Sequence, residues 1–457
     1  MISPNQNKRK NILIVGGNAA GPAAAAKAKR VDPTANVVLL EASDFISTGT
    51  CEMPYVLSGE IDDYKKIIFY DKEKFKSEKG VTIYTNHLVE SINRRSKEIS
   101  VINKIDGTKY NFPFDKLILT TGSQAKQLPD LNSNYSNVFV LKNIDNLISI
   151  QKFIKEKKPG TVLIIGSGYI GLEAADVFNS IGIKVYLVEK NNLPLPESEI
   201  EIQKLILDTI EKKSIEFIGG FKNISFKSNE FVESANIDGR LVEPDFIIVS
   251  VGSEPNNSLA IASGLFIGKF GGISVDQKLK SSDQNIFAAG DNIEVINKIT
   301  NLKDYIPLAT VAHELGHIAG ANAAGEHLSY SPIVKNIALK IFNNTYSQVG
   351  ITSDSARNYS FRFAEVNAIA RNIIKVMPES QNVFGKIVYE INSKRILGAS
   401  FFGGNEVVGY SDLIASLIFG NISAEKLTHI NYNYTPPKSP FINLLSILGR
   451  KILENKK

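Results

Sequence analysis

Short apolar runs that end in glycine-rich turns occur twice in the chain. The first run, residues 12–15, leads into the turn GGNAAG (16–21) and then an alanine-rich stretch. The second run, residues 162–165, leads into GSGYIG (166–171) and then an amphipathic stretch. A run of four apolar residues bounded by such turns is typical of a buried strand. Each copy therefore predicts a strand, a tight turn and a helix.

Each glycine-rich turn is followed by another apolar run that ends in an acid. Glu41 follows Gly21 by 20 residues, and Glu189 follows Gly171 by 18 residues. This spacing is typical of a carboxylate that binds ribose hydroxyls, while the glycines and the helix N-terminus accept a pyrophosphate. The pattern predicts two dinucleotide-binding units. The alternative is a pair of ordinary strand-turn-helix units without a ligand, and Asn18 stands where the middle glycine of the first motif is usual.

The rest of the pattern predicts further strands and a change of architecture near residue 329. No third glycine-rich turn follows, and the alternation becomes that of a mixed α+β region. We expect an α/β protein with two Rossmann-like dinucleotide-binding domains and a C-terminal α+β domain, with a boundary between Gly122 and Gly160. The additional expected strands are 245–252, 286–289, 337–342, 346–351 and 384–391, and a helix is expected over 407–418.

Composition agrees with several folded domains. The chain has 457 residues, 43% of them hydrophobic and 22% charged, which predicts about three domains and excludes a disordered chain. The net charge of +5 comes without a basic stripe rich in aromatic residues, so we expect small anionic ligands and no nucleic acid. Residues 1–10 lack the apolar core of a signal peptide, and no run reaches the length of a membrane span. We expect a cytoplasmic protein without a membrane partner.

The chain has one cysteine, Cys51. Intramolecular disulfides, paired redox cysteines and cysteine-based zinc clusters are therefore excluded. Cys51 follows a polar loop, and Pro54 suggests a helix start, so we expect the sulfur near a helix N-terminus that stabilises thiolate. The adjacent Glu52 would oppose thiolate formation if it pointed inward, and we expect it to point outward. The alternative is a small buried apolar side chain.

A second chemical motif is the HExxH sequence from His313 to His317. On a helix it places two imidazoles on one face, as in zinc proteases. The third histidine of the longer zinc-protease pattern would fall at residue 323, which is alanine. We expect no metal.

From about residue 11 to residue 437, the chain resembles the FAD-dependent pyridine nucleotide-disulfide oxidoreductases. The resemblance is to the single-cysteine branch, which includes coenzyme A-disulfide reductases, NADH-dependent persulfide or polysulfide reductases, and NADH oxidases and peroxidases. The motifs that carry it are GGNAAG (16–21), STGTC (47–51) with Pro54-Tyr55, DKLILTTG (115–122), the second turn through Glu173, AAGD (288–291) and YTPP (434–437).

The resemblance implies domain limits and cofactors. Residues 1–122 and 251–328 would form an FAD-binding domain, 123–250 an NAD(P)H-binding domain, and 329–457 a dimerisation domain. Glu189 would repel a 2′-phosphate and favour NADH, although Lys190 leaves NADPH open. The expected cofactor-binding residues are Gly16, Gly17, Ala20, Gly21, Glu41, Thr121, Gly122, Gly166, Gly168, Ile170, Gly171, Glu173, Glu189, Gly252, Gly290, Asp291, Leu308 and Ala309.

The resemblance also implies roles at the reaction centre. Cys51 would lie beside the flavin, Tyr169 would cover the flavin as a gate, and Tyr434 would reach the site from the partner in a homodimer. Glu41 would bind the FAD ribose, Asp291 its ribityl chain, and Glu173 would lie near the nicotinamide. The expected substrate-binding residues are Ala23, Lys27, Arg30, Ser47, Thr50, Lys74 and His313.

The expected function is NAD(P)H-dependent reduction of coenzyme A disulfide, persulfide or polysulfide through Cys51. One alternative is an NADH oxidase or peroxidase that cycles Cys51 through sulfenic acid; Ala19, where that branch has histidine, counts against it. Another is a flavin-bearing redox sensor or electron-transfer subunit. Thr48 replaces a usual aromatic residue and Glu52 a usual glycine, which keeps this second alternative open.

Overall fold

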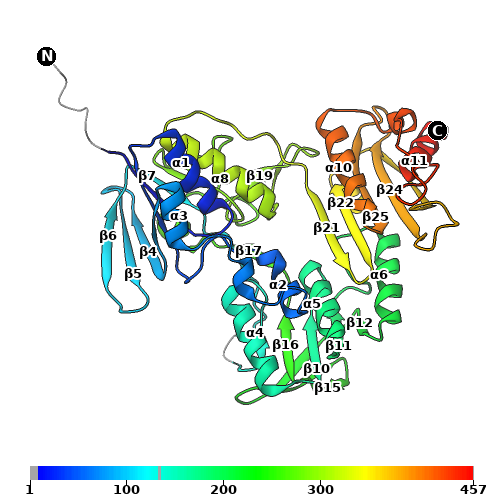
Figure 1. The fold of residues 1–457 in the computed structure, drawn as a ribbon, viewed down its shortest axis with the longest axis horizontal. Coiled ribbons are helices and arrows are strands. Elements are labelled where there is room, and N and C mark those ends of the chain that lie inside the picture. The colour runs from blue at the N-terminus through cyan, green and yellow to red at the C-terminus, as the bar shows by residue number, and fades with distance from the viewer. Residues whose placement is uncertain (1–8, 132–134, 456–457) are drawn as a thin grey trace.

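A computed structural model of the chain describes residues 9–131 and 135–455. Residues 1–8, where no signal peptide is expected, lie outside the described part. Figure 1 shows two α/β regions and a C-terminal region in which helices cover a sheet. No helix among the described residues is long and apolar enough to cross a membrane.

The first sheet is parallel, with the order β18-β7-β1-β2-β3. Its central strand is buried along four of its five residues, which explains the unbroken apolar run in the sequence. The strands are β1 (Asn11–Val15), β2 (Asn36–Leu40), β3 (Thr82–Tyr84), β7 (Lys116–Leu119) and β18 (Ile286–Ala288). The helices of this region are α1 (Ala20–Val31), α3 (Lys72–Lys79), α7 (Ser258–Ala262) and α8 (Ala309–Ala324).

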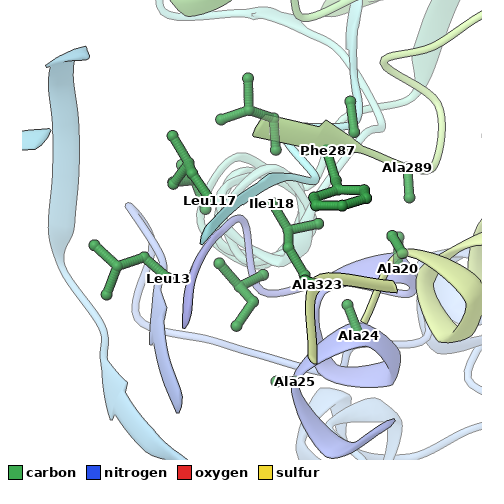
Figure 2. Packing of buried hydrophobic residues seen from close by; sticks show 14 of the residues in the cluster. Leu13, Ala20, Ala24, Ala25, Leu117, Ile118, Phe287, Ala289 and Ala323 are labelled. Carbon is green, nitrogen blue, oxygen red and sulfur yellow. The ribbon is translucent and has the colours of Figure 1, made fainter. Parts of the chain in front are cut away.

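Small residues let α1 and α8 pack backbone against backbone. A Cβ on Gly316 would lie 2.3 Å from the carbonyl oxygen of Ala20, and one on Gly320 would lie 2.1 Å from that of Ala24. Figure 2 shows Ala20, Ala24 and Ala323 at this contact. The alanines of α1 therefore form the face that packs against α8, and their small size lets the two helices lie close together.

The second sheet repeats the parallel plan, with the order β12-β11-β10-β16-β9. Its strands are β9 (Val138–Phe139), β10 (Thr161–Ile165), β11 (Lys184–Glu189), β12 (Glu216–Gly219) and β16 (Phe246–Val249). The helices of this region are α4 (Ile144–Lys157), α5 (Tyr169–Ser180) and α6 (Ile200–Lys212), and the short α2 (Met53–Leu57) packs against α4 and α5.

The C-terminal sheet is antiparallel, with the order β21-β22-β25-β24-β23. Its strands are β21 (Asn336–Ile341), β22 (Asn344–Gly350), β23 (Phe363–Arg371), β24 (Asn382–Glu390) and β25 (Ile396–Gly403). Three helices accompany them: α9 (Ser353–Asn358), α10 (Glu406–Phe419) and α11 (Leu444–Glu454). Together with the two parallel sheets, this confirms the predicted fold class.

Smaller antiparallel sheets were not expected from the sequence. They are formed by β4 (His87–Asn93), β5 (Glu98–Asn103) and β6 (Lys109–Pro113); by β13 (Ile224–Ser228), β14 (Val232–Ile237) and β15 (Arg240–Val242); by β8 (Ser123–Ala125) and β17 (Ser253–Pro255); and by β19 (Val295–Ile296) and β20 (Lys303–Asp304). The β8–β17 pair lies where the chain passes between the two parallel sheets. The exact domain limits stay a prediction.

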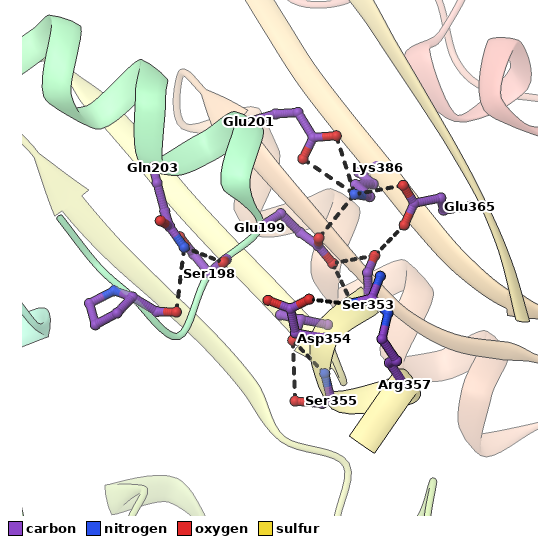
Figure 3. A network of polar contacts seen from close by, with 12 residues as sticks. Ser198, Glu199, Glu201, Gln203, Ser353, Asp354, Ser355, Arg357, Glu365 and Lys386 are labelled. Carbon is purple, nitrogen blue, oxygen red and sulfur yellow. Dashed lines mark hydrogen bonds and ion pairs between the residues drawn. The ribbon is translucent and has the colours of Figure 1, made fainter. Parts of the chain in front are cut away.

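A buried lysine ties α6 to the C-terminal sheet. Lys386 on β24 has a side chain only 3% exposed, and it forms ion pairs with Glu199 at 3.0 Å and Glu201 at 3.2 Å. Glu365 on β23 pairs with it at 3.2 Å, and Ser353 donates to Glu199 from its backbone N–H at 2.7 Å (Figure 3). Burial alone would lower the pKa of Lys386, but the three carboxylates outweigh it and raise the pKa. The lysine is therefore charged inside the protein.

Replacing this lysine by an apolar residue should destabilise the fold. In Lys386→Met, Glu199 stays buried at 4% exposure and loses its cation, which costs about 3 kcal/mol of unfolding free energy. Urea denaturation would measure the change. The control is Lys375→Met at an exposed position, which should change stability by less than about 0.5 kcal/mol. Equal denaturation midpoints for the two variants would show that the ion-pair network does not hold α6 on the sheet.

Candidate active site

The first glycine-rich turn is shaped for a phosphate group. Gly16 has a φ of +109°, and a Cβ there would lie 2.2 Å from the carbonyl oxygen of Thr120. A Cβ on Gly21 would lie 1.9 Å from the carbonyl oxygen of Gly16. Only glycine lets α1 start this close to the turn. The helix has no side-chain cap and no acid in its first turn, so its N-terminus suits an anion.

The same turn is tied to the loop that carries Cys51. The N–H of Ser47 donates to the carbonyl oxygen of Gly17 at 2.8 Å. The N–H of Thr48 donates to Oδ1 of Asn18 at 3.1 Å. Asn18, which departs from the usual glycine, therefore has a defined partner in the neighbouring loop.

Glu41 stands at the end of β2, where a ribose-binding acid is expected. One of its oxygens accepts the N–H of Gly17 at 2.6 Å, and the other accepts the N–H of Ser43 at 2.7 Å. These bonds hold the carboxylate at the edge of the first glycine-rich turn.

The second turn has the same construction. Gly166 has a φ of +97°, and a Cβ on Gly171 would lie 2.0 Å from the carbonyl oxygen of Gly166. The hydroxyl of Ser250 donates to this carbonyl at 2.8 Å, as Thr120 does to Gly16 at 3.0 Å in the first unit. The start of α5 also lacks a side-chain cap. Both turns therefore fit a dinucleotide pyrophosphate.

Glu189 is the acid of the second unit. The backbone and hydroxyl of Ser167 donate to one of its oxygens at 3.0 and 3.1 Å, and Asn191 donates to the other at 3.0 and 2.9 Å. Burial would raise the pKa of Glu189, but these hydrogen bonds outweigh it and lower the pKa. Its negative charge is therefore fixed next to the second turn, while Lys190 beside it is exposed.

The carboxyl edge of the first sheet fits the remainder of an FAD molecule. Gly290 has a φ of +97°, and a Cβ there would lie 3.1 Å from that of Ala20. Asn292 donates to the carbonyl oxygen of Leu119 at 2.9 Å, but its own Oδ1 is buried without a hydrogen-bond partner. Burial raises the pKa of the neighbouring Asp291. An unpaired buried acceptor beside a carboxyl group indicates that a ligand donates here.

Seven more expected cofactor residues lie in or next to elements at these edges. Thr121 donates from its hydroxyl to the carbonyl oxygen of Asn256 at 2.6 Å. Gly122 and Gly252 have positive φ angles, which favour glycine, and a Cβ on Gly168 would meet open space. Helix α8 starts after Leu308 without a side-chain cap. The residues placed in this way are Thr121, Gly122, Gly168, Gly252, Leu308 and Ala309, and Ile170 is 37% exposed.

Cys51 lies where the two dinucleotide-binding units meet. It belongs to a 3₁₀ turn (Thr50–Glu52) that runs directly into α2, and it is exposed. Charges from both units act on it: Glu173 on α5 and Asp291 after β18. The structure thus brings together three residues that lie far apart in the sequence.

The surroundings of Cys51 agree with one expectation and differ from another. Its turn leads directly into α2, as expected, but the pKa of the thiol is not lowered. The pKa of its thiol is raised, first by burial of the surrounding site and then by Glu52, Glu173 and Asp291. The helix that follows has five residues and does not offset these charges. The side chain of Glu52 is half-buried and lies against Gly49, where an added Cβ would lie 2.4 Å from its Oε2. The site is therefore rich in carboxylates around the sulfur.

Two residues of α5 face the same junction. Burial, followed by the charge of Asp176, raises the pKa of Glu173 to about 7. Tyr169 begins α5, and its hydroxyl is buried without a hydrogen-bond partner. Burial and Glu197 raise the pKa of Tyr169, so its hydroxyl stays protonated. The unpaired hydroxyl suits a residue that rearranges when a ligand arrives.

Sequence reasoning missed a polar chain at this junction. Lys142 donates to the hydroxyl of Ser123 at 2.7 Å, and this hydroxyl donates to Asp291 at 3.2 Å. Tyr305 lies close to Asp291, and its own hydroxyl is buried without a partner. Lys142, Ser123 and Tyr305 belong to no motif with fixed spacing, so only the proximity of β8 to the strand ends could reveal them.

The expected substrate-binding residues fall into separate groups. Close packing of α1 on α8 brings Arg30 to 3.4 Å from Nδ1 of His317, whose ring lies 4.7 Å from that of His313. Lys27 pairs with Glu326 at 3.8 Å. This edge, which carries Lys27, Arg30, His313 and His317, is called the basic edge of α1 and α8, although Glu326 offsets the charge of Lys27.

The other expected substrate residues lie on the loop before α2 and on α3. Ser47 has a φ of 52°, and Thr50 starts the turn that holds Cys51. Lys74 on α3 lies over the ring of Tyr70, 5.0 Å from its centre. Ala23 is only 5% exposed and packs in the protein, which does not suit direct contact with a substrate.

The HExxH motif lies on α8, and its two histidine rings are 4.7 Å apart and tilted by 55° to each other. Burial, followed by the charges of His313 and Arg30, lowers the pKa of His317. Among residues 9–131 and 135–455, no group of three or more histidine, cysteine or acidic side chains is arranged to hold a metal. Arg30, a cation, occupies the position next to His317.

Tyr434 follows the last 3₁₀ turn (Ala424–His429) in the C-terminal region. It is 45% exposed, and its ring meets that of Phe441 edge-on at 5.4 Å. Phe441 and Ile442 are 77% and 44% exposed. The contacts described within one chain do not connect Tyr434 to Cys51.

Comparison with known proteins gives full-length similarity. An NADH oxidase from Methanocaldococcus jannaschii is 29% identical over 443 residues, covering 97% of this chain and 98% of the relative. A coenzyme A disulfide reductase from Staphylococcus aureus is 26% identical over 441 residues, covering 96% and 99%. The crystal structure of reduced Bacillus anthracis CoADR-RHD has a TM-score of 0.93 at 26% identity and covers 98% of this chain and 81% of that one.

The family model described as pyridine nucleotide-disulphide oxidoreductase matches residues 10–316. This match includes both glycine-rich turns, their acids, Cys51 and Asp291. The chain therefore belongs to the pyridine nucleotide-disulphide oxidoreductases, a family of FAD- and NAD(P)H-dependent enzymes.

Proposed function

We propose that this oxidoreductase uses NADH to reduce a small disulfide or persulfide through Cys51, with coenzyme A disulfide as the leading substrate. The observation that carries the proposal is the position of the loop with Cys51, the chain's single cysteine. Its Ser47 and Thr48 bond to the first glycine-rich turn, and it runs directly into α2, which packs against α4 and α5 of the second unit. The full-length similarity to a coenzyme A disulfide reductase supports it. In the overall reaction, NADH, one proton and a disulfide RSSR give NAD⁺ and two thiols RSH.

Cys51 provides the covalent step. As a thiolate it attacks one sulfur of the disulfide, forms a mixed disulfide and releases the other sulfur as a thiolate. FAD, when bound, supplies the two electrons that it takes from NADH as a hydride. Because the chain has no second cysteine, the mixed disulfide cannot be resolved within the protein. Reduction therefore returns Cys51 to its thiolate and releases the second thiol.

Glu173 can hold a proton for this reaction. Its raised pKa means that about half of the molecules carry a proton on Glu173 at neutral pH. A buried acid with a pKa near the working pH suits transfer to a departing thiolate. Asp176, three residues along the same helix, is also raised in pKa by burial.

The basic edge of α1 and α8 supports a phosphate-bearing substrate. Arg30 and the adjacent rings of His313 and His317 lie at this edge together with Lys27, whose charge Glu326 offsets in part. Such charges suit the phosphates of coenzyme A and give no advantage to an uncharged disulfide.

We propose a homodimer in which Tyr434 reaches the partner's site. The exposed Tyr434, Phe441 and Ile442 supply apolar surface in the C-terminal region, which suits a protein interface.

A second candidate function is oxygen reduction, favoured by the similarity to an NADH oxidase.

Replacing Cys51 by serine tests the principal function. Cys51→Ser should lower the rate of NADH oxidation with coenzyme A disulfide by a factor of roughly 100 or more, because the nucleophile is lost. NADH absorbance measures the rate, and flavin absorbance checks that FAD stays bound. Undiminished turnover would exclude a role for Cys51. Fast oxygen consumption in the wild type, with no response to coenzyme A disulfide, would favour the second candidate.

Glu173 should make stability depend on pH. The pKa of Glu173 in the folded protein is above its ordinary value of 4.5, so its contribution is complete below about pH 4.5 and is lost as pH rises through 7. Glu173→Gln should remove this loss, a difference of roughly 3 kcal/mol at most. Urea denaturation at pH 5 and pH 8 and fixed FAD would measure it. Glu156→Gln, on an exposed part of α4, should follow the wild type; identical profiles for all three would contradict the prediction.

Glu189 should set the preference for NADH. Glu189→Ala removes a negative charge that would face the 2′-phosphate of NADPH, so kcat/KM for NADPH should rise relative to NADH by at least about tenfold. Steady-state rates with the two nucleotides measure the ratio. An unchanged ratio would show that the carboxylate does not discriminate between them.

A further inference from the structure

The turn that carries Cys51 is held by a second segment of the chain. Two backbone hydrogen bonds, of 2.7 and 3.0 Å, join residues 47–49 to residues 67–69. The N–H of Glu52 donates to the carbonyl oxygen of Gly49 at 3.2 Å and closes the 3₁₀ turn (Thr50–Glu52). Glu52 therefore has a fixed backbone position in the same single turn as the thiol.

The side chain of Glu52 lies back over this turn. A Cβ added at Gly49 would be 2.4 Å from Oε2 of Glu52 and 3.0 Å from Cζ of Phe69. The carboxylate and the aromatic ring are therefore neighbours, and only glycine at position 49 leaves room for both. Glu52 is half-buried, Phe69 is 53% exposed and Cys51 is exposed. We call the surface formed by Cys51, Glu52 and Phe69 the thiol entrance.

The charge of Glu52 is not neutralised by a cation. Within residues 9–131 and 135–455 it forms no ion pair at 4.0 Å or less, whereas Glu60, just after α2, pairs with Lys340 at 3.2 Å. Consecutive Cα atoms are about 3.8 Å apart, so chain connectivity keeps the carboxylate within on the order of 10 Å of the sulfur, which is the range of a charge in dilute salt. Burial raises the pKa of the thiol, and Glu52 is the first of the charges that raise it further.

A fixed negative charge at the thiol entrance distinguishes substrates by the charge that they carry at the sulfur. Cys51 as thiolate attacks a disulfide RSSR, forms the mixed disulfide Cys51–S–S–R and releases RS⁻. A disulfide with neutral arms brings no charge to this step, and the exposed ring of Phe69 suits such an arm. Inorganic polysulfide is an anion at the reacting sulfur, so Glu52 repels it. Coenzyme A disulfide belongs to the neutral class, because its phosphates lie at the far ends of uncharged arms.

We propose that Glu52 is a specificity-determining residue, which makes the site favour disulfides with uncharged arms over polysulfide and other substrates that are anionic at the sulfur. This assignment rests on the proposed function, in which Cys51 is the nucleophile. Glu52 acts through its charge, so aspartate keeps most of the preference and glutamine loses it.

Two alkylating reagents of different charge test the thiol entrance directly. Iodoacetamide is neutral and iodoacetate is an anion; both react with thiolate, and in this chain only Cys51 can react. Both rates are measured on the FAD-loaded protein at low salt, and their ratio cancels any change in the thiolate fraction. In Glu52→Gln the rate with iodoacetamide divided by that with iodoacetate should fall about three- to tenfold. Glu52→Asp should stay close to the wild type, and the control Glu73→Gln, at an exposed position of α3, should match it.

Turnover tests the same preference on sulfur substrates. The kcat/KM for coenzyme A disulfide divided by that for inorganic tetrasulfide should fall at least about threefold in Glu52→Gln. The assignment is overturned if Glu52→Gln keeps the wild-type alkylation ratio, or if the alkylation ratio changes while the preference between the two sulfur substrates does not.

The wild type provides a second measurement, should the variant fail to fold. Salt at about 1 M screens the charge of Glu52 and should lower the alkylation ratio of the wild type in the same direction. A ratio that does not respond to salt would likewise overturn the assignment. Alkylation needs no turnover, so a protein that shows the expected alkylation ratios but reduces neither sulfur substrate would contradict the proposed function alone.

Discussion

The packing of α2 against α4 and α5 is the contact on which the site depends. Met53, Val56 and Leu57 are 2%, 3% and 8% exposed, and they belong to the apolar core that contains Leu172 and Phe178 of α5. Burying each side chain stabilises by roughly 1.5–3 kcal/mol. Because Cys51 lies two residues before α2, this packing fixes the sulfur between the two units. The stabilisation from this apolar packing thus offsets the unfavourable charges around the thiol.

That charge arrangement has a chemical logic. Carboxylates around the sulfur favour a protonated resting thiol, and burial keeps a proton on part of the Glu173 population near neutral pH. The thiol of Cys51 and the carboxyl group of Glu173 can therefore both hold a proton close to where the proposed reduction releases thiolates.

Local patterns predicted the parts of the fold that depend on neighbouring residues. The two glycine-rich turns, Glu41 and Glu189 could be found because glycine geometry and strand length fix their spacing. Ser123 and Asp291 could not be paired in advance, since 168 residues separate them and only the sheet order brings them together. The contact of Glu52 with Gly49 could not be predicted for a related reason, because it depends on the fold of the loop itself.

Asn18 gives a different view of the first motif. In the sequence it departs from the usual glycine, yet its side chain accepts a hydrogen bond from Thr48, and Gly17 accepts another from Ser47. Two parallel bonds between two short loops remove most of their independent freedom. These bonds hold the first glycine-rich turn (16–21) and the loop with Cys51 (47–51) in a fixed relative position. The distance from a nucleotide bound at this turn to the sulfur of Cys51 would then be set by these two hydrogen bonds.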